Sequence, residues 1–180
     1  MDELALHVLD IAQNAITAGA KMVTIRALQS LEADSLDLWV EDDGCGMSPA
    51  MLESVTSPFT TSRTTRKVGL GIPLLKQTAE MTGGSFVIES TEGVGTKLHA
   101  RYVPSSLDML PLGDMGSTML LLVQQKPDMR FVYERSLGDR SFTLDTDALR
   151  TELEGVPLDT PEVLDFIQGF VQENESELQA

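Results

Sequence analysis

The chain has 180 residues, enough for one complete hydrophobic core, and its 42% hydrophobic content indicates a globular protein whose longest apolar stretch, 119–123, is too short to span a bilayer. The net charge of −15, from 13 basic and 28 acidic residues, argues against free nucleic acid as a partner, because phosphate binding needs a basic face. One cysteine excludes an internal disulfide framework, and the first residues lack the basic segment of a secretion signal, so we expect a cytoplasmic protein without a membrane partner.

Helix and strand patterns alternate from the beginning of the chain. Apolar residues recur at helical spacing over 3–18, where Gly19 follows as a stop. Alternation of apolar and polar residues predicts strands at 23–27 and 36–40, and Ser48-Pro49 is typical of the start of a short helix over 49–55.

The next segment begins with a polar run, 60–67, that lacks periodicity and predicts a loop. A second long helix is expected from about Gly69 to the pair Gly83-Gly84, followed by strands at 85–90 and 96–103. Helices that cover one face of a mixed, mostly antiparallel sheet make an α+β fold, a two-layer α/β sandwich.

Pro104 to Pro111 predicts a boundary between a domain of residues 1–104 and a small acidic α/β extension of residues 105–180. The elements expected in the extension are a helix at 113–124, a hairpin of 130–136 and 140–145, a short helix at 147–153, and a helix after Thr160-Pro161. The hairpin could extend a sheet, form a dimer edge or complete the first domain's core. We expect a protein partner or a homodimer to use this extension.

Four short motifs follow one another within the first hundred residues. They are Asp10-x-x-x-Asn14 with Ala18-Gly19-Ala20, Asp42-x-Gly44-x-Gly46, Gly69-Leu70-Gly71, and Gly93-Val94-Gly95-Thr96. Together they supply an oxygen ligand for magnesium, an acceptor that reads a purine, and glycines where phosphates touch the backbone. Their order and spacing resemble the ATP-binding domain shared by histidine kinases, DNA gyrase, mismatch-repair ATPases and heat-shock chaperones, the GHKL or Bergerat fold.

That resemblance covers about residues 1–103 and implies ATP and Mg²⁺ as cofactors. It implies that Asn14 binds the magnesium ion, and that Asp42 accepts a hydrogen bond from the adenine amine with the help of Thr96. Arg63, Arg66 and Lys67 form a cationic run before the glycine motif, and we interpret it as a lid over polyphosphate. The expected ATP-binding residues are Asn14, Asp42, Gly44, Gly46, Met47, Arg63, Lys67, Gly69, Leu70, Gly71, Ile72 and Thr96.

Asp10 is the candidate catalytic residue. It shares a helix face with Asn14, four residues later. ATP-hydrolysing and serine-kinase members of the resembled family carry Glu at this position, whereas histidine kinases carry Asn. An aspartate shortens the carboxylate's reach by about 1.5 Å, one C–C bond. Asp10 is therefore either a general base or a residue that holds magnesium-bound water or polar neighbours.

Three functions stay open at this stage. The first is a stand-alone ATPase or nucleotide-dependent switch whose extension docks a partner. The second is a protein serine/threonine kinase similar to anti-sigma factors, and the third is an ATP sensor that does not hydrolyse its ligand. The Asp10 motif begins almost at the first residue, so we do not expect the phosphoacceptor hairpin of a complete histidine autokinase.

Overall fold

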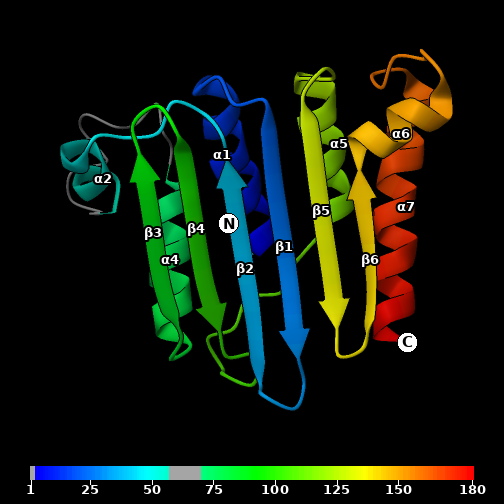
Figure 1. Cartoon of the computed structure of the whole chain (residues 1–180). Coiled ribbons are helices and arrows are strands. Elements are labelled where there is room, and N and C mark those ends of the chain that lie inside the picture. Colours follow the sequence, from blue (N-terminus) through cyan, green and yellow to red (C-terminus); the bar gives the residue numbers. More distant parts are fainter. Residues whose placement is uncertain (1–2, 57–69) are drawn as a thin grey trace.

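A six-stranded sheet in the order β3-β4-β2-β1-β5-β6 forms one layer of the molecule (Figure 1). The computed structural model describes residues 3–56 and 70–180. The strands are β1 (Met22–Ser30), β2 (Ser35–Asp42), β3 (Ser85–Thr91), β4 (Gly95–Tyr102), β5 (Arg130–Leu137) and β6 (Arg140–Asp145). Each neighbouring pair is antiparallel except β1 and β5, which are parallel.

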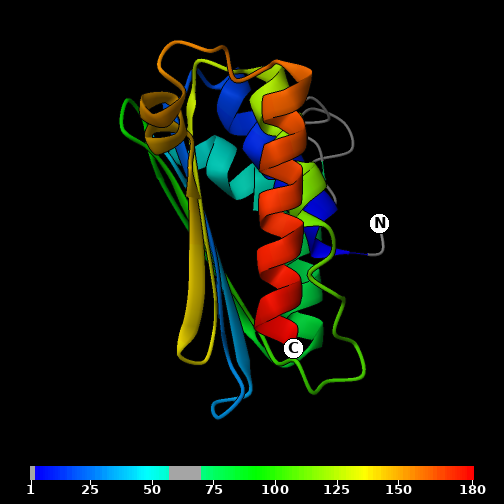
Figure 2. The same ribbon diagram turned by 90° about the vertical axis from the view of Figure 1, so that its right-hand side faces the viewer.

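Helices form the second layer. Figure 2 shows α1, α4, α5 and α7 on one side of the sheet. The helices are α1 (Leu4–Thr17), α2 (Pro49–Thr56), α4 (Gly71–Met81), α5 (Met115–Gln125), α6 (Thr146–Leu153) and α7 (Pro161–Gln179). The predicted α+β two-layer sandwich with a mixed, mostly antiparallel sheet is confirmed.

The alternating patterns of the strands place their apolar residues against the helices. In β1, Val23, Ile25 and Ala27 are fully buried, whereas the residues between them are partly exposed. The opposite face of the sheet is polar, and there the Trp39 and His99 rings stack with centroids 3.9 Å apart. A sheet with one buried and one solvated face needs only one covering layer of helices, as observed.

The predicted hairpin extends the sheet. β5 lies beside β1, and its residues Phe131 and Tyr133 are buried in the same hydrophobic cluster as residues of α1 and β1. Buried Arg135 forms an ion pair with Glu175 of α7, with 2.8 Å between Nε and Oε1. Residues 105–180 therefore add strands and helices to the same sheet and the same core.

One strand boundary differs from the sequence prediction for a visible reason. β1 continues to Ser30, three residues beyond the predicted end, because it pairs with β2 on one edge and β5 on the other. The long helix α4 ends at Met81, and Gly83, with φ of +88°, follows the C-cap as the predicted stop. Within the described segments, no helix is long and apolar enough to cross a bilayer.

The two tyrosines of the core differ in their polar contacts. The Tyr102 hydroxyl donates to the Leu75 carbonyl oxygen at 3.2 Å and shares a hydrogen bond with Thr78 Oγ1 at 3.0 Å. The buried Tyr133 hydroxyl has no hydrogen-bond partner within residues 3–56 and 70–180. Burial raises the pKa of both phenols, so both stay neutral.

We expect Tyr133→Phe to raise the free energy of unfolding by about 1 kcal/mol, because it removes a buried hydroxyl whose desolvation no hydrogen bond offsets. Tyr102→Phe, the matched control, should lower it by a similar amount of about 1 kcal/mol, because two partners lose their hydrogen bond. Urea denaturation of both variants measures the difference. A destabilised Tyr133→Phe protein would contradict the prediction.

Candidate nucleotide-binding site

A cavity of about 290 Å³ opens between α1, the loop after β2, α4 and β4. We call it the α1 cavity. It combines an apolar wall with a few polar groups, as small-molecule sites usually do. Its lining residues are Ile11, Asn14, Ala15, Thr17, Ala18, Asp42, Cys45, Gly46, Met47, Met51, Ile72 and Thr96.

Asp42 supplies the acidic group of the cavity wall. It ends β2 opposite Thr96 of β4, and its Oδ1 accepts from the Gly44 amide at 2.8 Å. Burial raises the pKa of Asp42, although hydrogen bonds from the Gly44 and Thr96 amides partly oppose that shift. Because a carboxylate has about four acceptor positions, Asp42 can accept a further hydrogen bond from a ligand.

The loop after Asp42 packs closely against the β3–β4 hairpin and is hydrogen-bonded to it. Gly46 has φ of +70°, and a Cβ there would lie 2.1 Å from the Thr91 carbonyl oxygen, so only glycine fits. The Met47 amide donates to Ser90 Oγ at 2.8 Å, and Ser90 Oγ lies 2.8 Å from Thr96 Oγ1. Hydrogen bonds thus connect the Met47 backbone to Thr96, the residue opposite Asp42.

Cys45 joins two of the glycine motifs through its backbone. Its amide donates to the Ala18 carbonyl oxygen at 3.0 Å, and its carbonyl oxygen accepts from the Gly93 amide at 2.7 Å. The Ala18-Gly19-Ala20 and Gly93-Val94-Gly95-Thr96 segments therefore meet on either side of the same loop. Asp43 fixes the loop from the other end, because its Oδ1 accepts from the Lys21 and Met22 amides at 2.7 and 3.0 Å.

Asp10 connects α1 to the beginning of α4. Its Oδ2 accepts from the Gly71 amide at 2.7 Å. A Cβ on Gly71 would lie 2.9 Å from Ile11 Cγ1 and 3.0 Å from Asp10 Oδ2, so the absent side chain lets the two helices approach. Asp10 itself is outside the lining of the α1 cavity. Its carboxylate satisfies one of the amides that a helix N-terminus leaves without an intrahelical partner.

The structure brings together six of the twelve residues predicted to bind ATP. Asn14, Asp42, Gly46, Met47, Ile72 and Thr96 all line the α1 cavity. Gly44 and Leu70 are not part of its lining: Gly44 forms the turn that holds Asp42, and Leu70 is 49% exposed just before α4. Gly71 contacts Asp10 instead. Arg63, Lys67 and Gly69 lie outside the described residues.

Sequence reasoning missed other residues of the wall. Ile11 and Ala15 precede and follow Asn14 on the same helix, and their helical spacing was a usable signal. Met51, which comes from α2, had no such signal, because its place depends on how α2 packs. Ser90, in contrast, is a hydrogen-bonding partner that only the pairing of β3 with β4 brings to Thr96.

The α1 cavity combines a half-buried carboxylate beside a glycine turn with a neighbouring helix N-terminus, features that suit a small polar ligand. The family model described as "Histidine kinase-, DNA gyrase B-, and HSP90-like ATPase" matches residues 2–106, more than half of the chain. The chain belongs to this family, and the membership supports ATP binding.

The curated relatives of this chain include sensor proteins. It is 31% identical to a sensor protein of Shewanella frigidimarina over 111 residues. This aligned segment covers 59% of this chain and 17% of that protein. It is 36% identical to the osmosensing histidine protein kinase SLN1 of Saccharomyces cerevisiae over 77 residues. This aligned segment covers 40% of this chain and 6% of the kinase. The chain therefore spans less than a fifth of the length of these two relatives.

Solved structures are similar in fold at low sequence identity. The N-terminal domain of a DNA repair protein has a TM-score of 0.53 and 12% identity, over 81% of this chain and 53% of that chain. Since the family model matches residues 2–106 only, this likeness in fold extends beyond the matched segment.

The raised pKa of Asp42 predicts a pH-dependent cost in stability. Because the folded pKa lies above the ordinary one, the ionised carboxylate destabilises the folded state at neutral pH, and this cost disappears as the pH falls through the raised pKa. Asn keeps an oxygen that can accept from the Gly44 amide. We therefore expect Asp42→Asn to unfold at a higher temperature than the parent at neutral pH, with a difference that shrinks on acidification. Calorimetric scans across the acidic range measure it, and a constant difference would contradict the assignment.

Proposed function

We propose that the α1 cavity binds ATP together with Mg²⁺ and that the chain hydrolyses ATP in the manner of an ATP-driven switch. The observation that carries the proposal is the Asp42 carboxylate, half-buried in a cavity whose wall also includes Asn14 and Thr96. An ionised carboxylate only accepts hydrogen bonds, so it selects the amine of adenine against the carbonyl of guanine.

The donor set fits a magnesium ion shared with phosphate groups. Asn14 offers an amide oxygen in the cavity wall. Within residues 3–56 and 70–180, no cluster of three or more His, Cys, Asp or Glu could hold a metal by itself. Mg²⁺ typically takes one or two protein oxygens and completes its octahedron with phosphates and water, where it neutralises phosphate charge. Asn14 is the residue that would hold it here.

The beginning of α4 is suited to the polyphosphate. Ile72 in the first turn of α4 lines the cavity, so its amide lies close to the space that a ligand occupies. The Gly71 amide already donates to Asp10, and Pro73 has no N–H. Helix N-termini favour anions through their free N–H groups and their dipole. Asp10 holds the Gly71 amide and thereby keeps this helix end against α1.

For hydrolysis, we assign Asp10 as the base that orients the attacking water. It lies one turn before Asn14 on α1 and so stands on the side of the cavity where the metal and the phosphates would be. A carboxylate that accepts one hydrogen bond through Oδ2 keeps capacity to accept another from water.

A second candidate function is an ATP sensor without turnover. The hydrogen bond from the Gly71 amide to Asp10 favours it, because this contact gives Asp10 a structural role that needs no chemistry. For either function, we propose that residues 1–104 form the ATP-binding unit and that residues 105–180 dock a protein partner.

We expect Asp42→Ala to weaken ATP binding by about tenfold to a hundredfold, because the loss of a charge-assisted hydrogen bond costs about 1.5–3 kcal/mol. Asn14→Ala should remove the magnesium dependence of binding while ATP alone still binds. Isothermal titration calorimetry with and without Mg²⁺ measures both. Asp139→Ala, in the exposed turn after β5, is the charge-matched control and should bind as the parent does.

Phosphate release from Mg-ATP distinguishes the two functions. Asp10→Asn keeps an oxygen that accepts from the Gly71 amide, so it removes the charge and spares the contact between the helices. We expect this variant to bind Mg-ATP normally and to lose phosphate release. If the parent releases phosphate and the variant does so equally, Asp10 is not the base. A parent that binds without release is a sensor.

A further inference from the structure

A second cavity, of about 650 Å³, lies between β6, α6 and α7, far along the sheet from the α1 cavity. We call it the β6 groove. Its apolar lining includes Leu149 and Leu153 of α6 and Phe166 and Phe170 of α7. The three elements that enclose it lie together at the edge of the molecule facing the viewer in Figure 2. It is therefore a large apolar hollow at the surface, of the kind that marks binding sites.

An aromatic series runs from the core to this surface. The ring centroids of Tyr133 and Phe142 are 5.9 Å apart, those of Phe142 and Phe170 are 6.1 Å apart, and those of Phe170 and Phe166 are 5.8 Å apart. Tyr133 is fully buried, whereas Phe166 is 52% exposed. Its neighbours thus hold the exposed ring in place, so less conformational entropy is lost when a partner binds.

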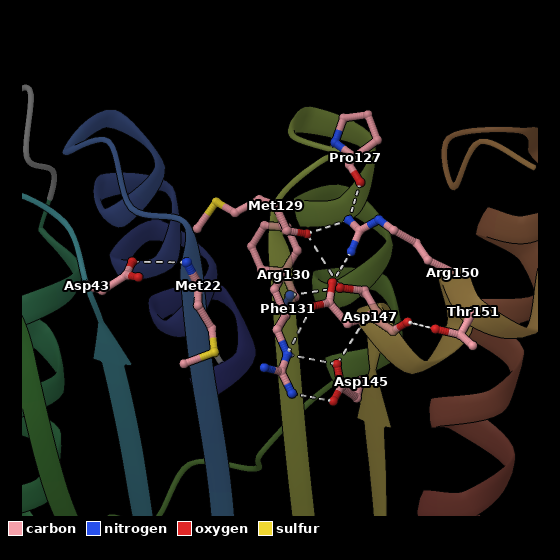
Figure 3. Close-up of polar contacts among 11 residues, drawn as sticks. Met22, Asp43, Pro127, Met129, Arg130, Phe131, Asp145, Asp147, Arg150 and Thr151 are labelled. Carbon is pink, nitrogen blue, oxygen red and sulfur yellow. Dashed lines mark hydrogen bonds and ion pairs between the residues drawn. The ribbon is translucent and has the colours of Figure 1, made fainter. Parts of the chain in front are cut away.

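Polar contacts hold β5, β6 and α6 together beside the groove (Figure 3). Arg130 Nη2 donates to Asp145 Oδ2 at 2.7 Å, at the end of β6. The Phe131 amide donates to Thr146 Oγ1 at 2.9 Å, and Arg150 donates to the Met129 carbonyl oxygen at 2.8 Å. These contacts fix α6 against the start of β5, so the hollow exists before a partner binds.

One wall of the groove is a free strand edge. β6 is the last strand of the sheet, and within residues 3–56 and 70–180 no other strand pairs with its outer edge. Its central residues, 141–144, carry no charge, although natural proteins usually protect such edges with charged residues. An extended peptide can therefore pair with β6 and place alternate side chains into the hollow.

The charges around the groove select the partner. Glu152 and Glu162 belong to its lining, and residues 126–180 hold 13 acidic against 5 basic residues. Two of these cations, Arg130 and Arg150, already pair with Asp145 and Asp147. A second copy of the chain would bring the same acidic patch against itself, because a twofold interface repeats one surface. Complementarity instead requires a cationic segment.

We propose that the β6 groove binds a basic, extended segment of a partner protein, which adds to the sheet as a strand beside β6. Its apolar side chains pack on Phe166 and Phe170, and its Lys or Arg side chains lie opposite Glu152 and Glu162. The proposal gives a location and a chemistry to the docking role proposed for residues 105–180, and in that respect it rests on the proposed function. It needs neither ATP binding nor hydrolysis.

The probe is a fluorescent synthetic peptide of about nine residues, long enough to cover one strand, in which every second position carries Leu, Phe or Lys to face the groove and the positions between them carry Thr. It is titrated into the full chain by fluorescence anisotropy. We expect Phe166→Ala, and separately the pair Glu152→Gln with Glu162→Gln, to weaken binding by about tenfold, a loss of about 1.4 kcal/mol. The matched controls are Leu31→Ala, at another exposed apolar side chain, and Glu89→Gln with Glu92→Gln near the opposite end of the sheet.

Amide hydrogen exchange then locates the peptide. We expect amides of β6 to exchange more slowly in the complex. If the control variants weaken binding as much as the groove variants, the attraction is unspecific and the proposal is overturned. Groove-dependent binding without protection of β6 overturns the strand addition, and a dimer that the peptide dissociates identifies a second copy as the occupant.

ATP affinity of the same groove variants separates this proposal from the function of the α1 cavity. We expect Phe166→Ala to bind ATP as the parent does. A failure of peptide binding with intact ATP affinity would count against the groove alone, whereas absent ATP binding with intact peptide binding would count against the α1 cavity alone.

Discussion

The pairing of β1 on both of its edges is the constraint on which the rest of the structure depends. β1 is antiparallel to β2 and parallel to β5, so it joins the segment that resembles a nucleotide-binding domain to the C-terminal hairpin. Burial of Val23, Ile25 and Ala27 under the helices makes this arrangement favourable. Without the parallel pair, β5 and β6 would be a separate hairpin, and isolated hairpins are marginally stable.

The beginning of β1 also holds the loop of the α1 cavity. Asp43 accepts from the amides of Lys21 and Met22, and the Arg130 amide donates to the Lys21 carbonyl oxygen at 3.0 Å. Figure 3 shows Asp43, Met22 and Arg130 at neighbouring strand ends. The loop that carries Asp42 and the first residue of the hairpin are therefore anchored to one short segment. This explains why the cavity and the C-terminal part form one framework.

Two charged residues that are wholly or partly buried, Asp42 and Arg135, have different roles in the structure. Asp42 is partly desolvated in the cavity wall, as its raised pKa indicates. Arg135, in contrast, is buried with a complete set of partners. The Glu175 carboxylate accepts two hydrogen bonds from it, and the Gln29 side chain and the carbonyl oxygens of Ala27 and Ser136 accept the other three. The first arrangement leaves capacity for a ligand, whereas the second ties α7 to the sheet.

The sequence by itself determined the local elements and six of the residues around the α1 cavity. Periodicity is a local property, so α1, β2 and the hairpin could be located from it, and the glycine motifs marked the turns that bring Asp42, Met47 and Thr96 together. Only the tertiary structure decided that Ser90 contacts Thr96, that Asp10 contacts Gly71 and that β5 lies parallel to β1. These contacts join residues distant in the chain, and their formation depends on how whole faces pack. No local pattern records that packing.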